Sequence, residues 1–438
     1  MTRAGFVAVV VAGVLAIGAS AEPRLRGARA STSLDYAYAI AIQRDGKLVV
    51  AGRSASGRWT LALARYTVGG NLDARFGRRG RVRTAVGSPS YSWASAVGVA
   101  PGGKIVAAGR SGVYPNLGVA RYSPRGRPDR RFGRAGQVVT KFGPPKGINA
   151  WARALAIQGD GKVVVAGGRG RLIKGPWRFA LARYTNRGRL DPTFGRGGKA
   201  MTDAGPDGDA SAVEIQRDGK IVAAGDGFAL VRYTTSGKLD PSFGAGGVVR
   251  TGFGPSSHAF AVAIQKDGKI LVAGRATSSA SDDFALARYT SDGTLDASFG
   301  RGGKVVTNFG IKTSNGYPSD DWAYAVAVEP DGKIVLAGAS DIRGNAAQRS
   351  GTPLYDFALA RYSANGRLNP SFGRDGKGLT PFDEGQSLVQ DVAIQTDGKI
   401  VAVGGGAGYF DLARYTTDGL PDSSFGGGGK VITNFPPR

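Results

Sequence analysis

The stretch "AVAIQKDGKILVAG", residues 261–274, decides the fold, because two apolar runs flank a Lys-Asp-Gly-Lys turn. Both runs suit β-strands, and a tight turn of this kind closes hairpins. A third apolar run follows at 284–290, and a short fourth run follows at 304–307. No convincing helical periodicity occurs after residue 21. The segment therefore predicts four antiparallel strands in sequence.

Seven copies of this segment fill the chain, each with a Gly-Lys turn and an Arg-Tyr strand. The turn glycines are Gly46, Gly103, Gly161, Gly219, Gly268, Gly332 and Gly398. A unit of this length cannot bury its own apolar faces, so it must stack on its neighbours. We predict an all-β fold, a seven-bladed β-propeller of four-stranded antiparallel blades. A parallel β-helix is the main rival, although its rungs are normally shorter.

The repeats also predict the blade limits and the packing of the inner strands. The expected blades are about 35–84, 92–142, 150–202, 208–252, 257–308, 321–381 and 387–435. Simple alternation would put Ala259, Ala261 and Ala263 on one face of an inner strand, with Val262 and Ile264 on the other. The chain ends should meet near residues 36 and 434. The pattern leaves open whether strand 430–433 joins its own blade or the first.

The first 21 residues resemble a secretory signal peptide. Arg3 precedes an apolar run from Phe6 to Ile17, and residues 19–21 form a small-x-small cleavage site. We expect a signal peptide at 1–21, a linker at 22–34, the propeller at 35–438, and a secreted, extracellular protein. An uncleaved membrane anchor is the alternative, although the run is short for a span.

Composition limits the chemistry. The chain has 438 residues and no cysteine, which excludes disulfides and a thiol nucleophile. Its formal net charge is +25 at pH 7, so it should attract anionic polymers non-specifically. The alternative is that the arginines serve solubility alone. A hydrophobic content of 42% suits a folded protein.

Two strings carry a specific resemblance: "AVAIQKDGKILVAG" and "FALARYTSDGTLDASFGRGGKVVTNFG", residues 284–310. They resemble the delta-60 repeat family of bacterial secreted proteins, over roughly residues 35 to 435. This resemblance implies an extracellular propeller-like array and says little about activity. The order of strand, turn and strand is also similar to the NHL-type propeller repeat.

An arginine of the third strand and an acid eight residues later recur in every copy but one. A cation on an apolar strand face needs a partner, so we interpret these pairs as structural braces. A ring of acid–base sites is the functional alternative. In the sixth copy Asn369 replaces the acid, and Arg361 should be less well compensated. The pairs are Arg65/Asp73, Arg121/Asp129, Arg183/Asp191, Arg232/Asp240, Arg288/Asp296, Arg361/Asn369 and Arg414/Asp422.

The loops from second to third strand and between blades vary in length, whereas the other turns do not. A meander places all the variable loops at one end of the ring, where binding usually resides. Aromatic residues at this end could stack on sugar rings, or could simply pack between blades. The candidate ligand-binding residues are Tyr36, Trp93, Trp151, Trp177, His258, Asp320, Asp321, Trp322, Arg343 and Tyr355.

Catalytic and cofactor motifs are absent from the sequence. It has one histidine, no nucleophile elbow and no phosphate-binding Walker loop. We expect a non-enzymatic, monomeric binding or scaffolding module without metal or cofactor. A purely structural surface array is one alternative. A carbohydrate-active enzyme using loop carboxylates is another, because two acids suffice.

Partner expectations follow from charge and from the loops. The partner would be an anionic surface polymer, a glycan or a protein, with no specific nucleic acid and no membrane span after signal cleavage. The turn lysines would form a basic ring on the constant end. The alternative is a solvated face. These lysines are Lys47, Lys104, Lys162, Lys220, Lys269, Lys333 and Lys399.

Overall fold

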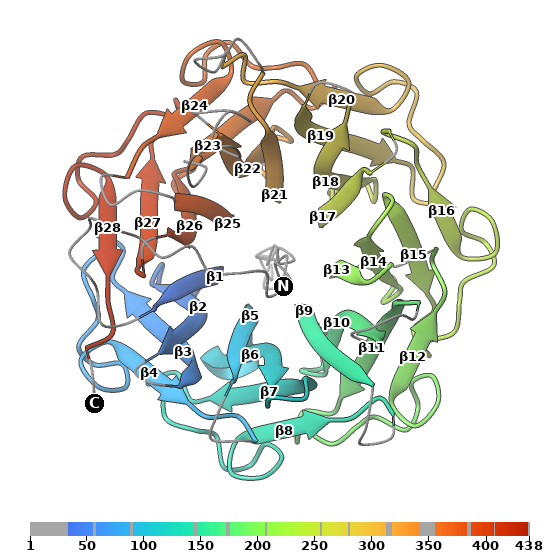
Figure 1. Cartoon of the computed structure of the whole chain (residues 1–438), viewed down its shortest axis with the longest axis vertical. Coiled ribbons are helices and arrows are strands. Elements are labelled where there is room, and N and C mark those ends of the chain that lie inside the picture. The colour runs from blue at the N-terminus through green and yellow to red at the C-terminus, as the bar shows by residue number, and fades with distance from the viewer. Residues whose placement is uncertain are drawn as a thin grey trace, which may run out of the picture.

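The computed structural model shows seven four-stranded sheets arranged in a ring, with the first strand of each sheet innermost (Figure 1). All pairing within a blade is antiparallel. The predicted seven-bladed propeller is therefore confirmed. The structure describes residues 34–55, 58–87, 91–143, 148–171, 176–205, 208–254, 256–278, 281–311, 318–341, 355–382, 387–406 and 408–436. The predicted signal peptide lies outside the described residues, as does residue 343.

The blades follow one another along the chain. Blades 1 and 2 are β1 (Tyr36–Ile42), β2 (Leu48–Ala55), β3 (Trp59–Tyr66), β4 (Arg81–Thr84), then β5 (Trp93–Ala100), β6 (Lys104–Ser111), β7 (Asn116–Tyr122), β8 (Gln137–Thr140). Blades 3 and 4 are β9 (Asn149–Ile157), β10 (Val163–Gly170), β11 (Arg178–Tyr184), β12 (Lys199–Thr202), then β13 (Ala210–Ile215), β14 (Ile221–Gly225), β15 (Ala229–Tyr233), β16 (Val248–Arg250). Blade 5 is β17 (His258–Ile264), β18 (Ile270–Thr277), β19 (Asp282–Tyr289) and β20 (Lys304–Thr307).

The last two blades repeat the pattern. Blade 6 is β21 (Asp321–Val328), β22 (Ile334–Asp341), β23 (Tyr355–Tyr362) and β24 (Lys377–Thr380), and blade 7 is β25 (Ser387–Ile394), β26 (Ile400–Gly406), β27 (Phe410–Tyr415) and β28 (Lys430–Thr433). The inner hairpin of blade 2 turns at η1 (Pro101–Gly103), where Gly102 has a φ of +76° and stands where the other copies have aspartate.

Ring closure uses no shared strand. The strand β28 pairs with β27 of its own blade, which answers the question that the sequence left open. Side chains hold the junction instead: Asp35 Oδ2 accepts the Phe435 N–H at 2.6 Å, and Arg81 Nε donates to the Asn434 carbonyl at 2.9 Å. Asp391, buried in β25, accepts the Ile40 N–H of blade 1 at 2.9 Å. The chain ends therefore meet where the repeat predicted.

Each inner strand carries a β-bulge near its start, which changes the expected alternation. In β17 the register shifts between Ala259 and Ala261, so Phe260 is the extra residue. Ala259 consequently packs with Val262 toward blade 4, while Ala261 and Ala263 pack toward blade 6. The prediction of three alanines on one face is thus wrong for Ala259. A bulge adds one residue, which reverses the side-chain direction beyond it.

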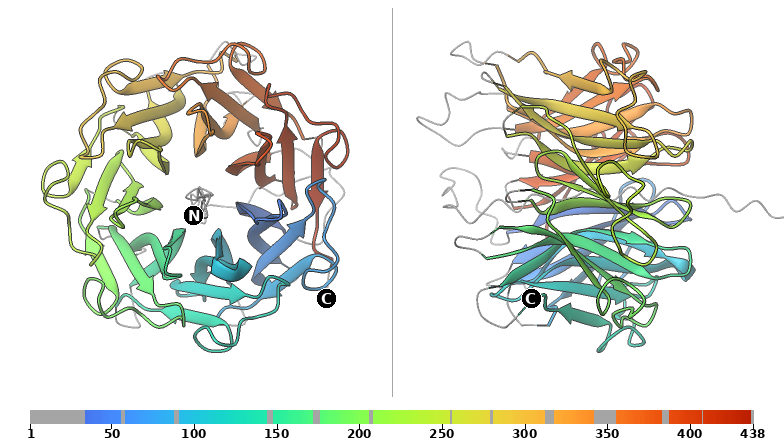
Figure 2. Two further views of the ribbon diagram at one scale, coloured as in Figure 1. Left: turned by 180° about the vertical axis from the view of Figure 1, so that it is seen from behind. Right: turned by 90° about the vertical axis from the view of Figure 1, so that its right-hand side faces the viewer.

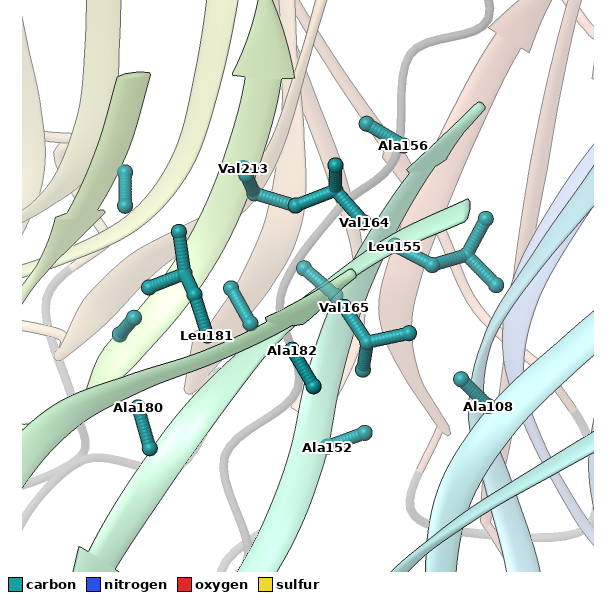
Figure 3. Packing of buried hydrophobic residues seen from close by; sticks show 14 of the residues in the cluster. Ala108, Ala152, Leu155, Ala156, Val164, Val165, Ala180, Leu181, Ala182 and Val213 are labelled. Atoms are coloured by element: carbon teal, nitrogen blue, oxygen red, sulfur yellow. The ribbon is translucent and has the colours of Figure 1, made fainter. Parts of the chain in front are cut away.

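The core lies between blades rather than inside one sheet. In blade 3, Leu155 faces blade 2, where one of its methyl groups closely approaches Gly98, and Val164 lies beside Val213 of blade 4 (Figure 3). Every blade is thus apolar on both faces, as the sequence of its first two strands indicated. The core is therefore divided into clusters between neighbouring blades, for example one between blades 4 and 5 and another between blades 5 and 6.

The two ends of the ring differ. A tight turn joins the first strand to the second, and a longer connection, residues 67–80 in blade 1, joins the third strand to the fourth. Both lie at one end of the ring, which we call the constant face (Figure 2). The other end, the variable face, holds the starts of the inner strands, the second-to-third loops and the links between blades.

Candidate functional site

The brace arginines lie at ion-pair distance from their acids in six blades. The N···O distances are 2.8 to 3.0 Å for Arg65, Arg121, Arg183, Arg232, Arg288 and Arg414. In blades 3, 4, 5 and 7 a hydroxyl two residues after the aspartate donates to the same carboxylate at 2.6–2.7 Å. Burial disfavours the charge on Asp191, but the Thr193 hydroxyl, the Thr193 N–H and Arg183 outweigh it and lower its pKa to about 2.

The same arginines also join neighbouring blades. The second guanidinium nitrogen, Nη1, donates to a carbonyl in the third-to-fourth-strand turn of the next blade. These acceptors belong to Pro124, Asn186, Thr235, Ser291, Ala364, Thr417 and, across ring closure, Val68. Each guanidinium carbon lies 4.4–4.8 Å from the ring centroid of the phenylalanine in the Phe-Gly motif. The braces are therefore fasteners between blades, a role that the spacing within one repeat did not reveal.

The turn lysines are not free charges. In six blades the lysine ammonium lies 2.9–3.5 Å from the brace aspartate. In blade 6, Lys333 pairs with Asp331 of its own turn at 2.5 Å. Each of these lysines is therefore paired with a carboxylate, and in six blades the lysine belongs to the brace.

Blade 6 replaces the missing acid from another strand. Asn369 carries no charge, but Glu329 stands at a position that holds glutamine in every other blade except blade 2, which has Ala100. Glu329 Oε1 lies 3.8 Å from Arg361 Nη1, and both side chains are buried. Burial raises the pKa of Glu329, and the Arg361 charge opposes that rise. Arg361 therefore has a counter-charge, supplied from the inner hairpin, but a more distant one than the 2.8 to 3.0 Å pairs of the other blades.

Several candidate residues lie at or near the starts of the inner strands, at the variable face. Tyr36, Trp93, Trp151, His258 and Trp322 are all half-buried there. Polar side chains at these positions and at the bulges often reach the next blade. Arg153 Nε binds Asp209 at 2.7 Å, Ser211 Oγ lies 3.2 Å from His258 Nε2, and Gln390 Nε2 donates to the Tyr36 hydroxyl at 3.2 Å. Packing between blades is therefore one function of these positions.

Arginines stack on several of these aromatic rings. The guanidinium of Arg53 lies 3.7 Å from the Trp59 ring centroid, and that of Arg110 lies 4.9 Å from the Trp93 centroid. Trp151 stacks on Trp177 at 4.4 Å. Arg53 and Arg110 follow the glycine that ends the apolar part of the second strand, as does Arg275, but the other four copies have no arginine there. Sequence reasoning missed Arg53, Trp59 and Arg110.

Two exposed tyrosines extend this surface beside blade 2. Tyr91 is 45% exposed and Tyr114 is 74% exposed. They belong to the two variable loops of that blade, next to Trp93. Aromatic side chains of this exposure contribute little to the core, so their rings are accessible to a ligand.

A mixed acidic and aromatic cluster joins blades 5 and 6. Asp282 Oδ2 accepts the Trp322 indole N–H at 2.9 Å and Arg275 Nη1 at 2.6 Å. Asp320 Oδ1 accepts the Asp282 backbone N–H at 2.9 Å, and burial raises the pKa of Asp320. The Tyr355 ring lies 5.4 Å from Trp322. The structure thus brings Asp320, Trp322 and Tyr355 together.

Asp321 and His258 have structural partners. Asp321 is completely buried, and it accepts hydrogen bonds from the Phe309 N–H at 2.8 Å and the Ser340 hydroxyl at 2.5 Å. Burial raises its pKa to about 6. It anchors β21 to the end of blade 5, so it does not line a ligand surface as expected. His258 is held between Ser211 and Asp226.

Arg343, the remaining candidate, lies outside the described residues. Among the described residues, no group of three or more histidine, cysteine or acidic side chains is arranged to hold a metal ion. Within the same part of the chain, no helix has the length and apolarity needed to cross a bilayer.

The repeats match a known family. The family described as "Domain of unknown function (DUF5122) beta-propeller" matches residues 43–76, 158–194, 216–243, 265–299, 329–372 and 395–425. This match supports the interpretation of the segments as repeats of a propeller family. The matched segments leave out the second repeat, the copy in which Gly102 replaces the turn aspartate. No curated protein matches the chain.

Several solved structures are similar to the chain at low identity. A protein of unknown function from Bacteroides caccae is 12% identical, with 78% of this chain and 97% of that chain covered and a TM-score of 0.41. The WD40 propeller domain of Doa1 is 10% identical, with 92% and 100% covered and a TM-score of 0.47. The propeller domain of the Trilobed protease from Pyrococcus furiosus, described as having an open velcro topology, is 12% identical, with 91% and 97% covered and a TM-score of 0.41.

Proposed function

We propose that this protein is a secreted, non-enzymatic binding module that holds a polymeric ligand, most simply a glycan chain, on its variable face. The observation that carries the proposal is the set of half-buried aromatic rings, several of them stacked with arginine, at that end of the ring. The other end of every blade is occupied by braces. The loops of the variable face differ between blades, and loops on a rigid scaffold often carry binding, so we place the glycan site there.

The side-chain chemistry suits sugars. An aromatic ring offers a flat apolar surface, and an arginine beside it offers several donors in a fixed plane. Trp59 with Arg53 and Trp93 with Arg110 present both features, on adjacent blades. A chain of sugar units could contact several blades at once, which would raise its affinity without any single deep pocket.

The carboxylates support a binding role rather than hydrolysis. A glycosidase needs two acids that reach the scissile bond. Asp321 is fully buried and bonded to Ser340 and Phe309, while Asp282 is engaged by Trp322 and Arg275. Acids committed in this way are poorly placed to transfer a proton. Secretion is proposed from the signal-like residues 3–21.

The test is a glycan array with purified wild type, a variant and a control. The double variant Trp59→Ala/Trp93→Ala removes one stacked ring from each of blades 1 and 2. Met201→Ala is the matched control, because Met201 is 52% exposed on the outer strand of blade 3. Melting temperature is measured for each. We expect the double variant to lose at least about tenfold in affinity for whichever glycan binds, while the control keeps it.

Three results would overturn the proposal. One is the absence of any glycan that binds the wild type. Another is equal binding by the wild type and the double variant at unchanged melting temperature. The third is shortening of a bound glycan in chromatography, which would establish the rival carbohydrate-active enzyme. N-terminal sequencing of exported protein tests secretion, which predicts a chain that begins at Glu22.

A further inference from the structure

A shallow pocket on the constant face is lined by three arginines. It has a volume of about 360 Å³ and lies between Arg75 and Gly77 of blade 1 and Arg125 and Arg127 of blade 2. All three arginine side chains are exposed. Among the described residues none of their guanidinium groups forms a hydrogen bond or an ion pair, in contrast to the braces beneath them. The pocket therefore presents unneutralised charge to solvent.

The backbone around the pocket is well ordered. Arg75 N–H donates to the carboxylate of Asp73 at 3.1 Å, and the Gly77 N–H donates to the Arg125 carbonyl of the next blade at 2.9 Å. Arg127 N–H donates to the Ser123 hydroxyl at 3.2 Å. The bases of all three side chains are thus held in place, which lowers the entropy lost when they converge on a ligand.

The pocket is the centre of a larger cluster that we call the arginine crescent. Its members are exposed arginines on the third-to-fourth-strand turns of blades 1, 2 and 3. They are Arg75, Arg78, Arg79, Arg125, Arg127, Arg130, Arg131, Arg134, Arg187, Arg189 and Arg196. Clustered like charges raise one another's energy, so the folded protein gains when an anion neutralises them.

Several positions of the arginine crescent hold other residues in the remaining blades. Where Arg75 and Arg131 stand, blades 3, 4, 5, 6 and 7 have threonine or serine, which in each case donates to the acid or amide of its brace. At the junction of blades 4 and 5 the positions of Arg75, Arg125 and Arg127 hold Ser242, Asp292 and Thr294. Blades 1 and 2 therefore lack this hydrogen bond in the brace and have an exposed arginine instead. This exchange costs stability, which a ligand that binds the charge would offset.

We propose that the arginine crescent binds a linear polyanion that carries phosphate groups, with the pocket between blades 1 and 2 as its principal site. Guanidinium groups match phosphate oxygens with paired hydrogen bonds. The row of turns offers successive cations to successive phosphates. The crescent includes no aromatic residue on which a nucleobase could stack, so the favoured polymer is one without bases. This site is on the opposite face from the proposed glycan site and is independent of it.

The test uses inorganic polyphosphate as the probe, with fluorescence anisotropy at several salt concentrations. The variant Arg75→Ser/Arg125→Asn/Arg127→Asn installs residues that this chain has at the same positions of other junctions, namely Ser298, Asn365 and Asn71. The control Arg301→Ala/Arg367→Asn/Arg374→Ala removes three exposed arginines from the constant face of blades 5 and 6. Both variants change the net charge equally, so a difference between them reports position.

We expect the crescent variant to weaken polyphosphate binding at least about tenfold and to flatten the dependence of log K on log salt, because fewer counterions are released. The control should stay within about threefold of the wild type. Equal losses in both variants would overturn the site, since net charge alone would then explain binding. Unchanged binding in the crescent variant would do the same. Single-stranded DNA that binds as tightly as polyphosphate of equal charge, with the same dependence on the crescent, would overturn the ligand class.

Discussion

At the scale of single residues, the molecule depends on a buried guanidinium in each blade that performs three tasks. Arg288 binds Asp296 at 2.9 Å, binds the Ser298 hydroxyl at 3.2 Å and donates to the Ala364 carbonyl of blade 6. The pairing of Arg288 with Asp296 could be predicted from the constant spacing within a repeat. The hydrogen bond to the Ala364 carbonyl could not, because it depends on how two repeats pack together.

We predict that Arg288→Ala lowers the free energy of unfolding by about 3 kcal/mol. The substitution removes charged hydrogen bonds and a contact with the Phe299 ring, and leaves the Ala364 carbonyl without this donor. Asp296 keeps Lys269 at 3.1 Å, which limits the loss. Chemical denaturation measures the change. A variant that unfolds at the same denaturant concentration as the wild type would refute the brace.

A second prediction concerns the acid that changed position in blade 6. Glu329→Gln should lower the free energy of unfolding by about 1–3 kcal/mol, because Arg361 loses its buried counter-charge. Asn369→Asp, which restores the aspartate of the other blades, should recover most of that loss in the double variant. A double-mutant cycle gives the coupling energy. Additive effects of the two substitutions would contradict the idea that Glu329 takes the role of the missing aspartate.

At the scale of elements, glycines in the third-to-fourth-strand turns allow one blade to approach the next. Gly126 of blade 2 has φ +78°, and a Cβ atom there would lie 2.8 Å from the Phe76 ring of blade 1. The equivalent glycine of each blade meets the phenylalanine of the preceding blade in the same way. A turn glycine therefore serves both its local conformation and the docking of a neighbour.

We predict that Gly126→Ala destabilises the protein more than Gly302→Ala. Both glycines have positive φ, so both alanines are strained by about 1 kcal/mol. A Cβ atom on Gly302 would have no other atom within 4 Å, whereas one on Gly126 would meet Phe76. The collision should add about 1–3 kcal/mol. Thermal unfolding of the two variants compares them directly, and equal melting temperatures would show that the blades dock loosely at this point.

At the scale of the whole molecule, the braces make stability depend on pH. The pKa values of Asp73, Asp129, Asp191, Asp240, Asp296 and Asp422 are lowered in the fold. A carboxyl with a depressed pKa stabilises the fold above its unfolded pKa of about 3.9 and loses that contribution as the pH falls. Six such groups act together, so the protein should unfold over a narrow range of acid pH.

We predict that the melting temperature falls steeply between about pH 4 and pH 2, measured by circular dichroism at constant ionic strength. Asp321 acts with the opposite sign. Because burial raises its pKa to about 6, its contribution is complete below about pH 4 and is lost as the pH rises through 6. Asp321→Asn should therefore reduce the loss of stability between about pH 4 and pH 7. A melting temperature that is constant from about pH 5 to pH 2 would exclude the acid dependence.

Part of the candidate site could be predicted from sequence, and part could not. Trp93, Trp151 and Trp322 were identified because they recur ten residues before a turn glycine, at the start of an inner strand. Arg53 and Arg110 were missed, since their significance comes from the ring across the hairpin. Asp321 was misjudged, because nothing local shows that the Phe309 N–H and two serine hydroxyls enclose its carboxylate.

The sequence by itself determined the number of blades, the four strands of each and the internal pairing of arginine with aspartate. Those features are local: they depend on spacing within one repeat, and seven copies repeat the evidence. The tertiary structure alone decided the bulges of the inner strands and the contacts between repeats. These contacts are the arginine hydrogen bonds to the next blade and the closure through Asp35 and Asp391. It also decided that Glu329, and not a residue at position 369, supplies the acid of blade 6. These features depend on how one repeat is oriented against the next, and that orientation produces no constant spacing in the sequence.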